Sequence, residues 1–424
     1  RVLTSILYPF LILLIYFRKI IKKEDSNRFK EKIFFWNFNV LREHGSKVIW
    51  FHAASIGELK SIVPLIDELN HKNRNLEFLI TTVTLSSGNL AKEIFKNNNN
   101  VYHRFFPIDV EFLIKKFILM WRPDAIIIVE TEVWPNLISI IKKNKIPLAI
   151  INARLTEKTF KRWMFFPQTA KNIFNSFDLC LTANQETKKF LHELNARNIH
   201  FFGNIKLIGR INADFSDDIN SHFLSNNLIW CALSTHNTEE ALCLEVHLEL
   251  KKKYSNIKTI IIPRHTNRVK KIKKLCDNLN LGSQILSKNE RILDKHEIII
   301  INSFGDSNKF LKYSNSVFIG KSTIEKLERV GGQNPIDAAK LGCKIYHGPY
   351  VYNFKEIYSI LDKNNVSKLI KNSKELANNL INDLDGVKRK DEKFSRIMNN
   401  LSETTLFDTM KILNKFLFDE TKKT

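Results

Sequence analysis

Short apolar runs recur along this chain and alternate with lysine-rich segments of helical character. Each run is apolar over nearly its whole length, whereas a strand with one solvated face would alternate apolar and polar residues. Continuous runs are typical of parallel strands that are buried on both faces and joined by helices in repeated βα units. The predicted strands are Val48–His52, Phe78–Thr82, Ala125–Val129, Leu148–Ile151, Leu179–Leu181, Ile229–Leu233, Thr259–Ile262, Ile298–Ile301, Val317–Ile319 and Lys344–Tyr346.

The pattern lapses once, in a polar stretch at about residues 205–227, and then resumes. We therefore expect an α/β fold with two doubly wound domains, at residues 24–210 and 211–390, followed by a charged helical tail at residues 391–424. Because ligands of such sheets bind at the carboxyl ends of the strands, we expect a site in a cleft between two facing domains.

The first residues differ from the rest of the chain. Residues 2–17 carry no charge, and four basic residues follow within residues 18–23. A run close to the ~20 residues that span a bilayer, with its basic residues after it, predicts a single uncleaved membrane anchor and basic flank over residues 1–23. A cleaved signal peptide would carry its charges before the apolar run, and a buried helix is the other alternative.

The charge balance bounds the partners. Lysine and arginine number 66 and aspartate and glutamate 44, which gives a formal net charge of +22. Such a surface favours nucleic acid, anionic lipid or phosphorylated substrates, although a compositional bias toward lysine explains part of the excess equally well. The five cysteines contain no CxxC pair and fit neither a disulfide framework nor a zinc site.

The segment HAASIGE, residues 52–58, follows the predicted strand VIWF directly. Gly57 allows a tight turn there, and Glu58 falls at the start of the next helix, at the carboxyl end of the strand. A carboxylate in this place can act in catalysis. The alternative is a first-turn glutamate that the helix dipole stabilises.

The segment VETEVWPN, residues 129–136, follows another apolar strand. Its two carboxylates, Glu130 and Glu132, lie beside Trp134 and Pro135. Glutamates in an apolar setting can have raised pKa values or pair with a base. The alternative is a surface loop before a helix that has Pro135 in its first turn.

Basic residues also follow predicted strands. Lys206 lies in GNIK, and Arg264 lies in PRH with Arg268 after it. Positive groups at strand ends can hold a phosphate or a carboxylate, although most lysines and arginines of so basic a chain are solvated surface.

The segment GGQNPIDAAKLG, residues 331–342, pairs two glycines before Asn-Pro and a helix. This arrangement can direct backbone amides of a helix start toward an anion, and Asp337, one turn along, can reach a ribose. The alternative is a plain turn. The segment matches neither GxGxxG nor a P-loop, which weakens redox and kinase functions.

Nine segments, taken in order, resemble the motif series of the 3-deoxy-D-manno-octulosonic acid (Kdo) transferases of lipopolysaccharide assembly. Single motifs are weakly specific, but nine in one order are specific, and they cover about four fifths of the chain. They are HAASIGE, TTVTLSSG, VETEVWPN, INARLTEK, GNIK, STHNTEE, PRHTNR, GGQNPIDAAKLG and GPYVYNF.

The resemblance implies a GT-B fold, in which two Rossmann-like domains face each other. Residues 24–210 would form the acceptor side, and residues 211–390 would bind the nucleotide sugar. It implies inverting transfer of Kdo from CMP-Kdo to a lipid A precursor (lipid IVA), without a metal or other cofactor. It also implies an enzyme at the cytoplasmic face of the cell inner membrane that contacts anionic lipids and no nucleic acid.

The resemblance also implies roles for single residues. Glu58 matches the general base, which deprotonates the acceptor hydroxyl, and Glu132 matches a glutamate that positions the acceptor or the base. A lysine or arginine can stabilise the leaving phosphate in place of a metal. The residues implied in substrate binding are Ser55, Lys206, His236, Arg264, Gly332, Asn334 and Asp337.

The chain departs from the family pattern on the donor side. Gln333 stands where histidine is common, and Thr238 and Lys321 stand where glycine is common. The segment Ser322–Val330 is longer than usual. These departures concern loop geometry more than the reaction.

Two other functions compete with this interpretation. One is another membrane-associated GT-B glycosyltransferase with a different nucleotide-sugar donor. The other is a basic, membrane-attached nucleic-acid-binding protein, which would interleave aromatic and basic residues over a sheet or groove. Carboxylates at the strand ends would repel phosphates and argue against it.

Overall fold

The chain forms two compact units in the computed structural model. The first unit is Arg1–Arg210 with Ser402–Thr424, and the second is Ile211–Leu401. The structure describes residues 2–38, 40, 45–73, 75–211, 218–303, 305, 307–386 and 392–419. Part of the polar stretch expected between the domains, and the expected domain limits at residues 1, 390, 391 and 424, lie outside these residues.

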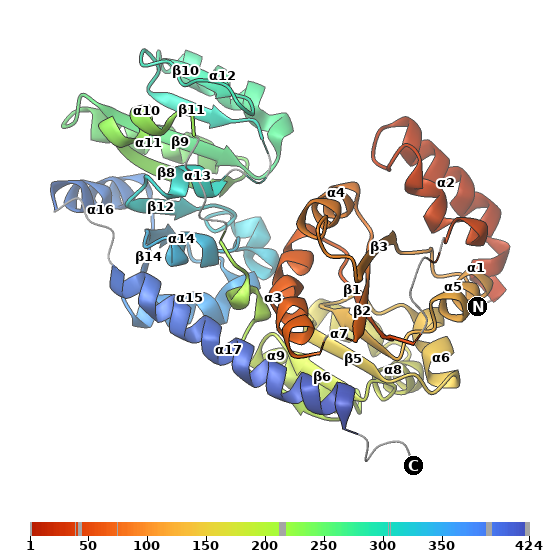
Figure 1. Ribbon diagram of the computed structural model, residues 1–424. Coiled ribbons are helices and arrows are strands. Elements are labelled where there is room, and N and C mark those ends of the chain that lie inside the picture. The colour runs from red at the N-terminus through yellow and green to blue at the C-terminus, as the bar shows by residue number, and fades with distance from the viewer. Residues whose placement is uncertain are drawn as a thin grey trace. The chain divides into compact units, whose positions relative to one another are not determined.

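The first unit is built on a seven-stranded sheet whose strands all pair in parallel (Figure 1). The strand order reverses between its third and fourth strands, which is the switch point where such sheets bind ligands. In spatial order the strands are β3 (Val101–Phe105), β2 (Leu76–Thr82), β1 (Lys47–His52), β4 (Ala125–Val129), β5 (Leu148–Ala153), β6 (Leu179–Thr182) and β7 (Ile199–His200).

The second unit repeats this plan with a second parallel sheet of seven strands. The order again reverses beside the strand that comes first in the unit. In spatial order the strands are β10 (Ser283–Leu286), β11 (Ile298–Ile301), β9 (Ile257–Pro263), β8 (Leu228–Thr235), β12 (Ser316–Ile319), β13 (Lys344–His347) and β14 (Ser367–Leu369).

Helices connect the strands of each sheet (Figure 1). In the first unit they are α3 (Ile56–Lys72), α4 (Leu85–Ile94), α5 (Glu111–Trp121), α6 (Pro135–Lys143), α7 (Glu157–Trp163), α8 (Pro167–Phe174), α9 (Gln185–Glu193) and the 3-10 helix η3 (Ile205–Ile208). In the second unit they are α10 (Ser221–Asn226), α11 (Glu239–Lys251), η4 (Thr266–Arg268), α12 (Val269–Asn278), α13 (Ser307–Leu311), η5 (Glu325–Val330), α14 (Ile336–Lys340), η6 (Tyr352–Phe354), α15 (Lys355–Lys363) and α16 (Ser373–Asp385). The last helix, α17 (Glu392–Phe418), begins in the second unit and ends in the first.

The strand β1 shows why the apolar runs are continuous. Val48 and Trp50 pack into a core on one face of the sheet, with side chains of α5, α6 and α8. Ile49 and Phe51 pack into a separate core on the other face, with side chains of α3 and with Met410 of α17. Because successive side chains of a strand point to opposite faces, both faces demand apolar residues.

The predicted fold class is confirmed: two Rossmann-like domains of the GT-B class are present. All ten predicted strands form, with small shifts of their ends. Four further strands, β3, β7, β10 and β14, were not predicted, and each of them is an edge of its sheet.

The single anchor helix predicted over residues 1–23 is not found in the part of this segment that the structure describes. The apolar run divides into α1 (Val2–Ile6) and α2 (Tyr8–Ile20), with Pro9 in the first turn of α2. Pro9 has no N–H to donate to the carbonyl of Ser5, so one helix ends and another begins there. No helix within the described residues combines the length and the apolarity needed to cross a bilayer.

Two short 3-10 helices, η1 (Arg28–Lys32) and η2 (Phe35–Asn37), follow α2. One side of α2 packs on this segment, since Ile15 is buried together with Phe29 and Ile33.

Candidate functional site

The first turn of α3 holds the carboxylate of Glu58 in the loop that follows β1. Ser55 is the N-cap residue, and its hydroxyl oxygen accepts the backbone N–H of Glu58 at 3.4 Å. The Glu58 carboxylate in turn accepts the Ser55 hydroxyl at 2.7 Å and the backbone N–H of Ala54 at 2.8 Å. Glu58 is therefore a first-turn glutamate, as the alternative interpretation expected, and its hydrogen bonds within the helix start fix the orientation of the carboxylate.

The environment of Glu58 raises the pKa of its carboxyl group toward neutral pH. Glu58 is only 7% exposed to solvent. Burial is the largest effect, and with the neighbouring charges of Glu130 and then Glu132 it raises the pKa of Glu58 to about 7, against the hydrogen bonds from Ser55 and Ala54. A carboxylate with this pKa is an effective general base at neutral pH.

Glu130 and Lys206 form a pair beside this turn. Glu130 follows β4 with φ at 59°, and its carboxylate pairs with the Lys206 ammonium. Asn152 donates its side-chain N–H to the same carboxylate at 3.3 Å and accepts the backbone N–H of Ile205 at 3.1 Å. Asn152 thereby ties the end of β5 to η3, which carries Lys206. A β-carbon at Gly57 would lie 3.8 Å from Cε of Lys206, so the lysine also lies next to the first turn of α3.

Glu132 also acts on Glu58 through its charge, and it lies next to a buried histidine. Its Oε2 accepts the indole N–H of Trp134 at 3.1 Å and lies 3.8 Å from Nε2 of His52. The His52 Nδ1 is hydrogen-bonded to the Thr81 hydroxyl at 2.8 Å. The Nε2 of His52 is buried and has no hydrogen-bond partner within the part of the chain that the structure describes. A buried polar atom without a partner is uncommon, and this one faces a carboxylate of the site.

The sequence-predicted residues of the first unit therefore come together. Ser55, Glu58, Glu132 and Lys206 follow different elements of the chain and converge at the carboxyl ends of β1 and β4. Two side chains of the same cluster, His52 and Asn152, were not among the predicted site residues. Glu130 was singled out together with Glu132 as a candidate carboxylate, but it was assigned no role of its own. The position of His52 as a polar last residue of a buried strand was the available signal for it.

The corresponding loop of the second unit is organised around Glu239. This residue begins α11, is only 1% exposed, and accepts five hydrogen bonds at 2.7 to 3.2 Å. The donors are the backbone N–H groups of His236, Lys321, Ser322 and Thr323 and the Thr323 hydroxyl. Glu239 thereby fastens the loop after β8 to the loop after β12, a role that sequence reasoning missed.

His236 and Arg264 lie at the ends of neighbouring strands. The His236 Nδ1 is hydrogen-bonded to the Ser234 carbonyl at 3.1 Å, and its ring centre is 5.7 Å from that of His265. Burial, the largest effect, lowers the pKa of His236. The backbone N–H of Arg264 donates to the Thr235 carbonyl at 3.0 Å, and its side chain is exposed. The two predicted residues therefore lie close together at the carboxyl ends of two neighbouring strands of the second sheet.

The paired glycines form a tight turn. A β-carbon at Gly331 would lie 2.2 Å from the Tyr350 carbonyl oxygen, and Gly332 has φ at 85°. The Gly332 N–H donates to the Lys321 carbonyl at 2.7 Å. The Asn334 side chain accepts the Ile336 N–H at 3.0 Å, and α14 has only five residues. The amides of Gly332 and Ile336, expected to face an anion, are therefore used within the chain, and Asp337 lies half-buried in α14.

Two departures from the family pattern fall on unusual backbone conformations. Thr238 has φ at 80° and Lys321 has φ at 57°. These are left-handed conformations, which glycine adopts without cost and other residues adopt with strain. The geometry explains why glycine is common at both positions in the family that the motifs resemble.

No group of three histidine, cysteine, aspartate or glutamate side chains could hold a metal ion within the described ranges. All five cysteines are buried, and none of these described residues forms a disulfide bond.

Comparisons with known proteins agree with the motif series. Residues 27–208 match the family model described as 3-Deoxy-D-manno-octulosonic-acid transferase (kdotransferase). The 3-deoxy-D-manno-octulosonic acid transferase of Rickettsia conorii is 30% identical over 341 residues, which are 79% of this chain and 71% of that protein. The transferase of Rickettsia bellii is 29% identical over 425 residues, which are 98% and 96% of the two chains. A probable mitochondrial transferase of Arabidopsis thaliana is 29% identical over 99% of this chain and 95% of that protein.

Solved structures of low sequence identity share the fold. A putative UDP-N-acetylglucosamine 2-epimerase from Listeria monocytogenes superposes with a TM-score of 0.62 at 16% identity, over 89% of this chain and 98% of that one. A glycosyltransferase from Rickettsia africae superposes with a TM-score of 0.60 at 13% identity, over 89% and 100% of the two chains. These likenesses concern the fold, whereas the sequence relatives identify the family. The chain belongs to the family of 3-deoxy-D-manno-octulosonic acid transferases and is a glycosyltransferase.

Proposed function

We propose that this chain transfers Kdo from CMP-Kdo to the lipid A precursor lipid IVA, with inversion at the anomeric carbon. The observation that carries the proposal is the carboxylate of Glu58, which is buried, oriented by two hydrogen bonds and has a pKa of about 7. Membership of the Kdo transferase family supplies the sugar, and Glu58 supplies the base that transfer to a hydroxyl requires.

The reaction then proceeds in one displacement. Glu58 accepts the proton of the acceptor hydroxyl as the hydroxyl oxygen attacks the anomeric carbon of Kdo. The bond between that carbon and the CMP phosphate breaks, and its electron pair leaves on the phosphate. Attack from the face opposite the phosphate inverts the configuration, and the sugar ring passes through an oxocarbenium-like state. CMP leaves as a phosphate monoester anion, so no acid has to protonate a sugar oxygen.

Neighbouring groups support the base. Glu132 lies beside Glu58 and within reach of His52, so it can orient the acceptor hydroxyl or hold the incoming proton. Lys206 neutralises Glu130 and limits the negative charge of the cluster. Without this lysine the repulsion between carboxylates would raise the pKa of Glu58 further.

The second unit is proposed to bind the donor. Arg264 presents an exposed guanidinium at the end of β9, near His236 at the end of β8. Both donor charges, the Kdo carboxylate and the cytidylate phosphate, suit a guanidinium partner. The turn that contains Gly332 and Asn334, with Asp337 after it, is the proposed nucleotide side.

The proposed place of action is an anionic membrane surface, which α2 contacts while lying in its plane. The side chains of Phe10, Leu13, Phe17 and Ile20 are 68%, 66%, 58% and 76% exposed and share one side of the helix. Ile15, on the opposite side, is buried. A helix with an apolar outer face and a basic end binds the boundary between headgroups and acyl chains.

Vesicle flotation tests the membrane contact. The triple variant Phe10→Ser/Leu13→Ser/Phe17→Ser should lose binding to vesicles that contain phosphatidylglycerol. Phe407→Ser is the matched control, because this phenylalanine is 69% exposed on α17. Equal flotation of the triple variant and the wild type would remove α2 from the proposal.

A donor assay tests the proposed reaction. The full chain is incubated with lipid IVA and CMP-Kdo, and the lipid products are identified by mass spectrometry. We expect the lipid to gain Kdo with CMP-Kdo and nothing with UDP- or GDP-sugars. Transfer from a UDP- or GDP-sugar, with none from CMP-Kdo, would replace this proposal by a GT-B transferase of different donor.

A further inference from the structure

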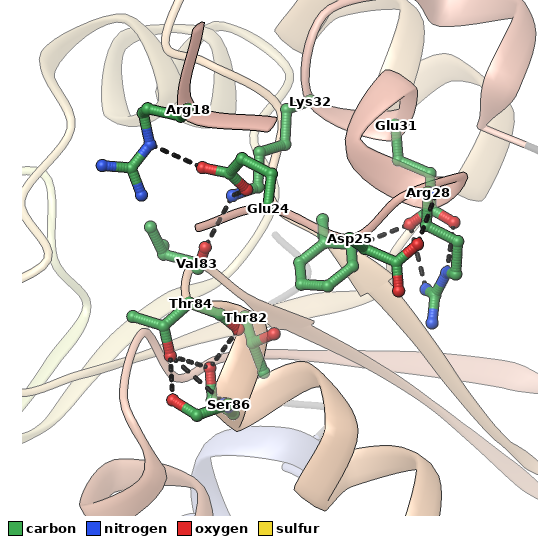
Figure 2. A network of polar contacts seen from close by, with 12 residues as sticks. Arg18, Glu24, Asp25, Arg28, Glu31, Lys32, Thr82, Val83, Thr84 and Ser86 are labelled. Carbon is green, nitrogen blue, oxygen red and sulfur yellow. Dashed lines mark hydrogen bonds and ion pairs between the residues drawn. The ribbon is translucent and has the colours of Figure 1, made fainter. Parts of the chain in front are cut away.

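A buried ion-pair network ties the segment after α2 to the loop that follows β2. The Glu24 carboxylate accepts Nε of Arg18 at 2.6 Å, and its second oxygen pairs with the Lys32 ammonium. The same ammonium donates to the Val83 carbonyl at 2.7 Å. Figure 2 shows the Lys32 side chain reaching from η1 toward both groups. The side chains of Glu24 and Lys32 are 1% and 5% exposed, so this contact is inside the protein.

A gain in stability does not by itself account for burying the Glu24 carboxylate and the Lys32 ammonium. Burial lowers the pKa of Lys32, and the hydrogen bond and charge of Glu24 oppose that effect. Removing an ammonium and a carboxylate from water costs free energy that their attraction only about offsets, and an apolar pair of the same size is often at least as stable. A buried pair that also reaches a backbone carbonyl is suited to hold that carbonyl in one place.

The carbonyl that Lys32 holds belongs to the loop that clamps Ala54. The backbone N–H groups of Val83 and Thr84 donate to the Ala54 carbonyl at 3.3 and 3.4 Å. The Ser87 hydroxyl donates to the same carbonyl at 3.1 Å. The N–H of Ala54 donates to Oε2 of Glu58 at 2.8 Å. Successive hydrogen bonds, linked through the backbone of residues 83–84 and of Ala54, therefore connect the Lys32 ammonium to the Glu58 carboxylate.

We infer that Lys32, fixed by Glu24, is a positioning residue for Glu58: it holds the Val83–Ser87 loop, which holds Ala54, which orients the carboxylate. The inference rests on the proposed function of Glu58 as the base. Lys32 itself touches no substrate in this account. Its effect passes through the backbone, and an ammonium-to-carbonyl bond is among the stronger bonds available for that purpose.

Loss of the ammonium should change both the place and the proton affinity of Glu58. If the loop relaxes, the Ala54 N–H moves away from Oε2, and the carboxylate loses a donor that favours its charged form. The other charged and polar groups that face Glu58 stay as they are: Glu130 and Glu132 raise its pKa, and Ser55 lowers it. The net change is therefore a rise in the pKa of Glu58.

The experiment measures turnover of the full chain with Lys32→Met. We expect kcat to fall about 10-fold, since displacement of a catalytic group by a fraction of an ångström has effects of this order. The KM for CMP-Kdo should stay within about twofold, because the network belongs to the first unit and not to the proposed donor side. The acidic limb of the kcat profile should move to higher pH by about half a unit.

The matched control is Arg28→Met, on the same short helix. Arg28 pairs with Glu31 at 2.7 Å (Figure 2) and donates to the His103 carbonyl at 2.9 Å, and within the described residues no hydrogen bond or ion pair joins it to Val83 or Ala54. Its loss should lower the melting temperature as Lys32→Met does and leave kcat and the pH profile at wild-type values. If Lys32→Met fails to fold, Ser87→Ala removes one donor from Ala54 and should shift kcat and the acidic limb in the same direction by less.

Two outcomes overturn the inference. In the first, Lys32→Met has a lowered melting temperature, but its kcat equals that of Arg28→Met and the acidic limb of its kcat profile is not shifted. Lys32 would then be a purely structural residue. If Lys32→Met does not fold, an unchanged kcat in Ser87→Ala leads to the same conclusion. Glu58→Gln separates this failure from that of the proposed function. An active Glu58→Gln would refute the base, whereas an inactive Glu58→Gln beside a normal Lys32→Met would refute only the positioning role.

Discussion

Each unit has a buried glutamate at the corresponding place, the start of the helix that follows the first strand of the unit. The surroundings of the two glutamates differ. Glu58 lies in the first turn of α3 with two hydrogen-bond donors and two neighbouring carboxylates. Glu239 begins α11 with five donors. Burial is similar, at 7% and 1% exposure, so it does not separate the two. The number of donors and the sign of the neighbouring charges decide whether a buried carboxylate is a base or a fastening for loops.

The largest expected effect comes from Glu58→Gln. The amide keeps the shape of the side chain but cannot accept a proton, so kcat should fall on the order of 10³-fold while the fold is kept. Turnover with CMP-Kdo measures the loss, and circular dichroism checks the fold. Glu68→Gln on the same helix is the control and should turn over normally. Near-normal turnover of Glu58→Gln would end the comparison, because both glutamates would then be structural.

Glu239→Gln, in contrast to Glu58→Gln, should mainly lower the stability of the protein. An amide offers one acceptor oxygen to five donors, and its NH2 group faces N–H groups of the backbone. The free energy of unfolding should fall by about 3 kcal/mol. Urea denaturation measures it, with the exposed Glu245→Gln on α11 as the control. Unchanged stability would show that the five donors find other partners and that Glu239 does not fasten the loops.

The difference in stability between the wild type and Glu58→Gln should depend on pH, in a direction fixed by the raised pKa of Glu58. The pKa of Glu58 is about 7 in the folded chain against 4.5 ordinarily, so the folded state binds the proton more tightly. Wild-type stability therefore decreases as pH rises from about 4.5 through 7, and the variant lacks this loss. The free energy of unfolding of the variant minus that of the wild type should therefore be on the order of 2 kcal/mol larger at pH 8 than at pH 4. A difference that is constant with pH would contradict the raised pKa.

The smallest expected effect concerns the left-handed residues near Glu239. Thr238→Gly should raise the free energy of unfolding by about 1 kcal/mol, because glycine adopts φ at 80° without strain. Lys321→Gly should act in the same direction. Thr238→Ala keeps a β-carbon and should gain nothing, which makes it the control. A destabilised Thr238→Gly would mean that the entropy of the unfolded chain outweighs the strain.

How far the sequence predicts the fold depends on the place of each strand in its sheet. Every interior strand of both sheets was predicted, because burial on two faces demands a continuous apolar run. The four edge strands were missed. The edge strand β3 reads Val-Tyr-His-Arg-Phe and is mostly half-buried, and β7 has two half-buried residues. Edge strands carry polar and charged side chains, so the apolar signal is absent there.

The candidate site likewise contains residues that the sequence predicted and residues that it did not. Glu58, Glu132 and Lys206 were predicted because each follows a buried strand or lies in a recognisable motif. The roles of Asn152 and Glu239 exist only through contacts between loops distant in the sequence, which no local pattern reveals. The anchor prediction counted apolar residues, whereas Pro9 divides the run into two helices, and no helix among the described residues is long and apolar enough to span a membrane.

The pH dependence of kcat/KM tests the central claim most directly, namely that the buried carboxylate of Glu58 is the base. In the wild type, kcat/KM should fall about tenfold for each pH unit below about 7, because protonation of Glu58 removes the base. The residual rate of Glu58→Gln should be flat over the same range. A wild-type profile that is flat between pH 5.5 and 8, or a Glu58→Gln profile that keeps the acidic limb, would contradict the claim.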